Sequence, residues 1–217
     1  MGDTPFYDRN VLKVEILEKA LSHVSFLGWK DPLILESLQD MNQDPSWSWR
    51  LFPEGVRDLL EFWSNSLDQE MLKILNKEGT SHLKIREKIT LAVKTRLILL
   101  ESHKDAARQA FYYFSKPQQI PLALRLSAKT VDEIWYWAGD KSTDYNYYTK
   151  RLLLGGVYSS TLFYWLKDES PDHQKTWDFL ERRINTVLEL PKLPQKAQAC
   201  TKDLAHRLRE VVGALRP

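Results

Sequence analysis

The feature that most constrains this chain is an uninterrupted run of uncharged residues, "LLLGGVYSSTLFYWL", at positions 152–166. Its 15 residues fall short of the roughly 20 that an α-helix needs to cross a bilayer. A run of this length instead predicts an α-helix that is fully buried inside the protein. Other helices must cover it, and 217 residues are enough for one sizeable core or two small domains.

The remaining sequence predicts helices throughout and contains no strong run of strand-like alternation. In the first predicted helix, 11–26, the apolar residues recur every four positions. Asp31 and Ser170 are expected as N-caps, each followed by a proline at the first helical position. The helices expected after the first lie at about 33–41, 47–52, 55–77, 82–102, 104–115, 118–127, 129–138, 143–167, 171–190 and 197–215.

The order of these helices predicts an all-α fold with three parts. The first, 1–53, has the helix, short helix, turn and short helix of a helix-turn-helix unit. A larger helical domain follows at 54–190, and a linker with a last amphipathic helix occupies 191–217. On architecture alone, this arrangement resembles the tetracycline-repressor family.

The charges of the N-terminal part, 1–53, argue against sequence-specific DNA binding. Residues 1–50 carry five bases and eight acids, a balance of −3, whereas phosphate contacts need Lys and Arg. The stretch that would be the recognition helix, "SWSWRLF", offers only Arg50 beside aromatic residues. We therefore expect no nucleic acid partner, and a ligand-responsive transcriptional regulator stays as the alternative function.

Enzyme motifs are also missing. The five histidines are scattered, no Glu-x-x-His pair exists for a di-iron bundle, and no phosphate-binding glycine loop occurs. A single cysteine, Cys200, excludes a disulfide framework. Asp140 and Asp144 are four apart and could ligate a cation, but helix capping explains Asp144 better. We predict a protein that is not an enzyme, with no catalytic residue, metal site or cofactor.

One stretch, "AGDKSTDYNYYTKR" at 138–151, is not explained by capping alone. Tyr147, Tyr148 and Arg151 are of the residue types enriched at protein–protein hot spots. The preceding "VDEIWYWAG" adds Asp132 and Ile134 nearby. This pattern indicates either a docking patch or tyrosines that only cover the core.

A resemblance is carried by "DEIWYWAGDKSTDYNYYTKR" and "VYSSTLFYWLKDESPDHQKTWDFLERRI", and more loosely by "FLGWKDPLILESLQD" and "LFPEGVRDLLEFW". These motifs are similar to those of an accessory family of coenzyme Q (ubiquinone) biosynthesis, the ninth of the numbered coenzyme Q proteins. The resemblance covers nearly all of the chain up to about residue 190. This chain has Tyr147 where many relatives carry tryptophan.

The resemblance implies a tetracycline-repressor-like fold without DNA binding and without catalysis. Such a protein would bind an isoprenoid quinone precursor, or another lipid, and present it to a di-iron demethoxyubiquinone hydroxylase. It would be a peripheral protein of the mitochondrial inner membrane, on the matrix side, or of the cytoplasmic face of a bacterial inner membrane. A homodimer is expected. The partner-binding residues that the resemblance implies are Asp144, Tyr147, Tyr148 and Arg151, to which the pattern of the preceding helix adds Asp132 and Ile134.

Two further surfaces are expected from the sequence pattern. Lining residues for the lipid are expected among the helices from 82 to 167: Val93, Leu97, Phe111, Phe114, Leu122, Leu126, Trp135, Leu153, Val157 and Leu162. A basic amphipathic tail, with six bases and two acids from 192 to 217, would meet the membrane surface. Its expected contacts are Leu204, Arg207, Leu208, Val211 and Leu215. The adjacent glycines 155 and 156 predict a close approach of two helices, within the domain or across a dimer.

Overall fold

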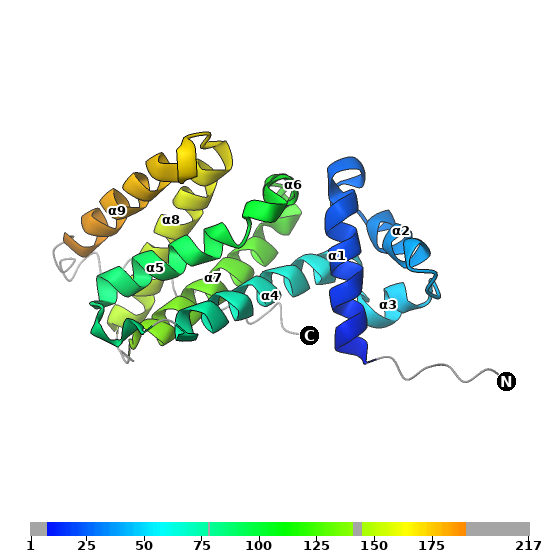
Figure 1. Ribbon diagram of the computed structural model, residues 1–217, viewed down its shortest axis with the longest axis horizontal. Coiled ribbons are helices and arrows are strands. Elements are labelled where there is room, and N and C mark those ends of the chain that lie inside the picture. Colours follow the sequence, from blue (N-terminus) through cyan, green and yellow to red (C-terminus); the bar gives the residue numbers. More distant parts are fainter. Residues whose placement is uncertain (1–7, 78, 141–144, 190–217) are drawn as a thin grey trace. The chain divides into compact units, whose positions relative to one another are not determined.

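The computed structural model describes residues 8–77, 79–140 and 145–189, and every regular element in these ranges is a helix. Figure 1 shows their order along the chain. The all-α prediction is therefore confirmed. The helices group into two compact units: the first holds 1–66 and 102–116, and the second holds 67–101 and 117–217.

Unit 1 is built around α1 (Arg9–Leu27), with α2 (Pro32–Asp40), the short α3 (Trp47–Leu51), the first half of α4 (Val56–Lys77) and α6 (Lys104–Phe114). Trp29 is its central side chain. Its ring stacks on Trp63 with 5.2 Å between centroids, and its indole Nε1 donates to the carbonyl of Ala106 at 3.0 Å. Gln109 donates to the carbonyl of Ser25 at 3.3 Å, so α6 is fixed to α1.

The turn before α2 differs in detail from the prediction. Asp31 does occupy the N-cap position of α2, but its side chain makes no capping bond there. Its carboxylate instead accepts from the backbone N–H of Val56 at 3.0 Å, at the start of α4. Gly55 lies beside this bond with φ +64°, and a Cβ at that position would collide with the Asp31 carboxylate. One acid therefore ties the α2 turn to α4.

Unit 2 contains the rest of α4, η1 (Thr80–His82), α5 (Ile85–Ile98), η3 (Pro117–Gln119), α7 (Ile120–Ala138), α8 (Tyr145–Lys167), η4 (Pro171–His173) and α9 (Gln174–Glu189); η2 (Glu101–His103) lies at the boundary. Helix α8 packs against both α7 and α9 (Figure 1). The prediction of two helices at 118–127 and 129–138 was wrong, because α7 is continuous. Thr130, in the second half of α7, faces a buried partner.

That partner is a polar cluster inside unit 2. Asp68 and Arg96 are both 3% exposed, and the Arg96 Nε lies 2.8 Å from an Asp68 carboxylate oxygen. Thr130 donates to the same carboxylate at 3.0 Å. The cluster joins α4, α5 and α7 in a largely apolar interior.

The domain boundaries also differ from those predicted. The boundary expected at 53/54 falls inside unit 1, which continues into α4 and includes α6. The division follows α6, which packs on α1 rather than within the larger unit. The predicted tail helix lies outside the described residues.

The uncharged run 152–166 forms most of α8, but it is not fully buried as predicted. Its inner side is, with Trp165 and Thr161 at 0% exposure. Its outer side is not, since Leu152 is 46% and Phe163 is 43% exposed. Within the described ranges, the main neighbours of α8 are α7 and α9, with a smaller contact to α5. Among the described helices, none is both long and apolar enough to span a membrane.

Candidate functional site

The docking residues predicted from sequence meet at the start of α8, around Arg151. Its guanidinium pairs with Asp132 of α7 and lies over the Tyr147 ring, 3.3 Å from the centroid. The Tyr147 hydroxyl donates to the same Asp132 carboxylate at 3.3 Å. Tyr148 packs edge-on against Tyr147 with 5.1 Å between ring centroids. We call Asp132, Tyr147, Tyr148 and Arg151 the tyrosine cluster.

The turn between α7 and α8 sets the geometry of this cluster. Gly139 ends α7 in the left-handed conformation with φ 91°. Asp140 follows with its side chain 5% exposed, and its carboxylate accepts from Lys150 at 2.8 Å and from Arg151 at 3.3 Å. Arg151 is thereby held between two acids from different sides. The sequence offered Asp140 only as a possible cation ligand beside Asp144, because an ion pair across ten residues has no local signal.

Exposure decides which of the predicted residues a partner could touch. Tyr148 is 43% exposed, and the Asp132 side chain is 51% exposed while that of Arg151 is 16% exposed. Burial first, and then the Asp132 carboxylate, raise the pKa of the Tyr147 phenol. It therefore remains a neutral donor. The cluster is an aromatic and ionic surface in which Tyr148 is the more exposed of the two rings.

Two members of the predicted set do not join the cluster. Ile134 is 0% exposed and packs in the core, so the surface cluster does not include it and its contact with a partner stays a prediction. Asp144 lies outside the described residues. A residue that sequence reasoning omitted, Tyr136, is 80% exposed on α7, one turn from Asp132. Its exposure can be predicted only once it is known which face of α7 packs against the core.

The predicted lipid-lining residues divide between the two units. Phe111 and Phe114 belong to α6 in unit 1, and the others belong to unit 2. Leu153 and Leu162 are half-buried. The most deeply buried of the set, all at 6% exposure or less, are Val93, Leu97, Leu122, Leu126, Trp135 and Val157. Residues of a close-packed core and residues that line a cavity are equally buried. The lipid site therefore stays a prediction for unit 2.

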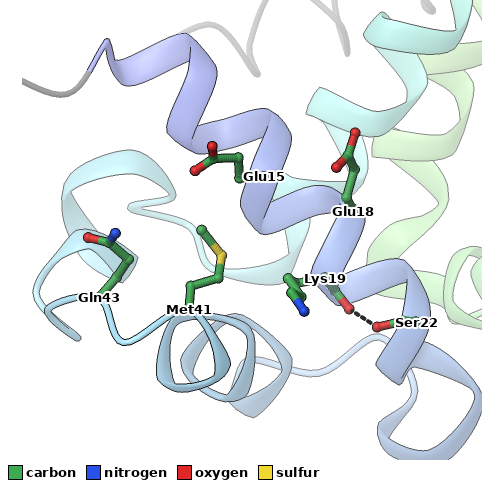
Figure 2. A pocket seen from close by; sticks show the side chains of 6 residues that line it. All are labelled: Glu15, Glu18, Lys19, Ser22, Met41 and Gln43. Carbon is green, nitrogen blue, oxygen red and sulfur yellow. Dashed lines mark hydrogen bonds between the residues drawn. The ribbon is translucent and has the colours of Figure 1, made fainter.

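An open pocket of about 510 Å³ lies in unit 1, away from the predicted lining residues. Figure 2 shows α1 on one side of it, with Glu15, Glu18, Lys19 and Ser22. Met41 and Gln43, after α2, complete it. Five of its six lining side chains are polar or charged, Met41 being the exception, which does not suit an isoprenoid tail.

Helix α3 occupies the place of a recognition helix, but its cation is engaged. The Arg50 guanidinium lies 5.4 Å from the Trp47 ring centroid and 5.3 Å from that of Trp49. Trp49 is 64% exposed. This surface offers aromatic rings where phosphate binding needs several cations. No group of three or more His, Cys, Asp or Glu side chains within the described ranges could hold a metal ion.

Comparison with known proteins places these features in context. The model of the COQ9 family matches residues 120–191, which contain α7, α8, α9 and the tyrosine cluster. "Ubiquinone biosynthesis protein COQ9-B, mitochondrial" from Xenopus laevis is 33% identical over 186 residues, covering 82% of this chain and 63% of that protein. The COQ9 protein of Rattus norvegicus is 30% identical over 199 residues, covering 89% of this chain and 64% of its own length.

The chain thus spans about three fifths of the length of the curated relatives it matches. Among solved structures, a TetR transcriptional regulator from Nitrosomonas europaea superposes with a TM-score of 0.67 and 20% sequence identity. The match covers 83% of this chain and 99% of the regulator. It confirms the tetracycline-repressor-like fold and, at this identity, the fold alone.

Proposed function

Since the chain belongs to the COQ9 family, we propose that it acts in ubiquinone biosynthesis as a non-enzymatic accessory protein. It binds an isoprenoid quinone precursor in unit 2 and presents it to a di-iron demethoxyubiquinone hydroxylase, which docks on the tyrosine cluster. The proposed place of action is the mitochondrial inner membrane; the names of the relatives support the mitochondrial part alone.

One observation carries this proposal. The sequence stretch with the longest family resemblance is also the stretch whose side chains form an exposed, ion-paired aromatic surface. A tyrosine that only filled the core would be buried, and it would not lie half-exposed beside two acid–base pairs. Tyr and Arg anchors held rigid before binding lose little conformational entropy on docking.

The lipid part has a physical reason as well. An isoprenoid tail is very insoluble, since each buried CH₂ contributes roughly 0.8 kcal/mol to its transfer out of water. Helical domains shield such ligands in apolar interiors and leave a polar head group for the enzyme. In unit 2, α5, α7 and α8 supply deeply buried aliphatic side chains, Leu97, Leu126 and Val157 among them. We expect these helices to surround the tail.

Mass spectrometry of the organic extract of the purified full chain tests lipid binding. We expect an isoprenoid quinone or its precursor at a level near one per chain. A protein of similar size that is purified in parallel from the same cells provides the background. An extract indistinguishable from that background would leave a scaffold without lipid as the function.

Docking is tested with Tyr148→Ala and Tyr112→Ala, a matched pair because both remove exposed tyrosines, and Tyr112, 64% exposed on α6 of unit 1, does not belong to the tyrosine cluster. Loss of a hot spot costs about 2 kcal/mol or more, so Tyr148→Ala should weaken hydroxylase binding roughly 30-fold. Tyr112→Ala should bind like the wild type. Calorimetric titration gives the affinities, and circular dichroism reports the fold. Wild-type affinity for Tyr148→Ala, or its unfolding, would favour a core-covering role for the tyrosines.

A further inference from the structure

The Tyr158 side chain carries a buried hydroxyl in the interior of unit 2. Tyr158 belongs to α8 and is 5% exposed. Among the residues that the structure describes, none makes a hydrogen bond with its hydroxyl. Buried polar groups in proteins are almost always hydrogen-bonded, because an unpaired one costs free energy. A ligand that accepts a hydrogen bond from this hydroxyl would explain it.

The buried Asp68–Arg96 pair lies near the same ring. Burial raises the pKa of the Tyr158 phenol, the positive charge of Arg96 lowers it, and the negative charge of Asp68 raises it. Both charges are therefore close enough to act on the phenol. Since the net effect is a raised pKa, the phenol keeps its proton at neutral pH and can donate a hydrogen bond.

Stability alone is a weak reason for an ion pair in this interior. Replacing a buried ion pair by apolar side chains of similar volume is often neutral or stabilising. The Arg96 Nε donates to Asp68 at 2.8 Å, and a guanidinium carries five N–H groups in a rigid fork. Arg96 can therefore donate to a ligand oxygen as well while it keeps its bond to Asp68.

The charges of these groups select a neutral ligand. The single charges of Arg96 and Asp68 cancel, and the hydroxyl groups of Tyr158 and Thr130 add none. A phosphate or carboxylate bound here would be a buried charge without its own counter-ion, close to the Asp68 carboxylate. A ring carbonyl accepts hydrogen bonds from a phenol and a guanidinium and adds no charge. A neutral quinone therefore suits this place better than the head group of an anionic phospholipid.

Residues predicted to line the lipid site lie beside these polar groups. Val93 is one turn before Arg96 on α5, Leu126 is one turn before Thr130 on α7, and Val157 precedes the tyrosine on α8. All three aliphatic side chains are buried, and the three helices pack on one another (Figure 1). Polar groups among apolar side chains match a ligand with an oxygen-bearing ring on an apolar tail.

Helix α8 has a bare backbone next to the tyrosine. Gly155 lies one turn before Tyr158, and a Cβ added there, or at Gly156, meets nothing within 4 Å. The close approach of another helix that these glycines predicted inside the domain is therefore wrong. Gly155 is half-buried, so its open side leaves room for a flat ring or an isoprene unit beside Tyr158.

The polar groups are also close to the tyrosine cluster along both helices. On α7, the buried Thr130 comes two residues before Asp132, whose side chain is 51% exposed. On α8, Arg151 lies seven residues before Tyr158, which is about 10 Å along the helix axis. A ring held at Tyr158 would thus be near a partner that docks on the tyrosine cluster.

We propose that Tyr158 and Arg96 bind the head group of the isoprenoid ligand by donating hydrogen bonds to a ring oxygen of a neutral quinone. Asp68 is a positioning residue that holds the guanidinium, and Thr130 holds Asp68. We call these four residues the head-group site. The inference rests on the function proposed above, to which it adds the class of head group and the residues that select it.

Three ligands with the same two-isoprene tail test the head-group site on the full chain. Geranyl-1,4-benzoquinone has ring carbonyls, geranylbenzene has the ring without oxygen, and geranyl phosphate has an anionic head. Quenching of tryptophan fluorescence follows the quinone, and the other two are measured by displacing it. Wild type should bind the quinone at least tenfold more tightly than either competitor.

Tyr158→Phe removes the hydroxyl and keeps the ring. This variant should raise the Kd of the quinone about tenfold and leave that of geranylbenzene unchanged. Asp68→Leu with Arg96→Met removes the guanidinium without leaving a buried charge and should lose the same preference. Tyr113→Phe is the matched control, because Tyr113 is a buried tyrosine of α6 in unit 1; it should bind like the wild type.

Thermal unfolding without ligand separates binding from a structural role. Tyr158→Phe should keep the Tm of the wild type, because its hydroxyl makes no hydrogen bond within the described part of the chain. A clearly lower Tm would assign the hydroxyl to the fold and overturn the inference.

The outcomes also separate this inference from the function on which it rests. Equal affinity of wild type for the quinone and geranylbenzene, unchanged by Tyr158→Phe, would overturn the head-group site and leave lipid binding in place. Tighter binding of geranyl phosphate than of the quinone would overturn the neutral head group. A wild type that binds none of the three ligands would overturn the proposed function and the head-group site together.

Discussion

At the scale of single residues, Asp168 has the most defined role. It follows α8, and its carboxylate accepts from the backbone N–H of Ser170 at 2.9 Å. It also accepts from the backbone N–H and the hydroxyl of Thr176 at 2.9 and 2.6 Å. Burial by itself raises the pKa of Asp168, but the bonds from Thr176 and Ser170 outweigh it and hold that pKa well below its ordinary value. This acid, more than the predicted cap Ser170, fixes the start of α9.

Asp168→Asn should therefore destabilise the protein in a pH-dependent way. Because the folded pKa lies below the unfolded value of 3.8, the carboxylate contributes fully at neutral pH. Its contribution is lost as the pH falls below about 4 toward the folded pKa. We expect the substitution to cost about 1 kcal/mol at pH 7 and less near pH 2. Urea unfolding at several pH values measures this, and a pH-independent difference would contradict it.

Replacing each of two glycines by alanine should change the free energy of unfolding in opposite directions. Gly55→Ala forces a positive φ on a residue with a side chain and brings its Cβ against Asp31, so the free energy of unfolding should fall by more than about 1 kcal/mol. Gly155→Ala adds a methyl group to a helix in open space and should raise it by about 0.5–1 kcal/mol. Thermal unfolding of both variants at low protein concentration gives the comparison. Equal effects would refute the strain at Gly55.

At the scale of helices, the buried Asp68–Arg96 pair links three elements of unit 2. Removing one partner leaves the other charge in an apolar interior, so Asp68→Asn should cost about 3–5 kcal/mol. Replacing both partners by apolar residues, Asp68→Leu with Arg96→Met, should recover most of this loss. Urea unfolding of the single and double variants tests the coupling. A double variant no more stable than the single one would place the cost in Thr130 or in packing.

This pair also shows what the sequence could and could not predict. The apolar spacing of α1 and α4 was enough to place those helices to within two residues. The break expected within α7 was wrong, and the partner of Thr130 on α4, Asp68, could not be predicted from the sequence around 130. The same limit applies to the site: residue types identified Tyr147, Tyr148 and Arg151, whereas Asp140 depended on the geometry of a turn.

At the scale of the whole molecule, the basic tail predicts weak electrostatic binding to membranes. Each base near an anionic surface contributes about 1 kcal/mol, and the sequence from 192 to 217 has a balance of +4. The full chain should therefore float with anionic liposomes at low salt, and a chain that ends at Pro191 should not. Neutral liposomes are the control. Equal flotation of the two chains would remove the tail from the mechanism, and flotation that resists salt would exclude its electrostatic part.

The interleaved path of the chain has a consequence for its synthesis. Unit 1 needs α6 to complete its contact with α1, yet α6 is translated only after α5 of unit 2. At 5–20 residues per second, roughly 3–10 seconds pass on the ribosome between residues 66 and 116. During this interval the surface that α6 will cover, on α1 and on Trp29 just after it, stays open to water or to a chaperone. The nascent chain therefore cannot finish one unit before it begins the other.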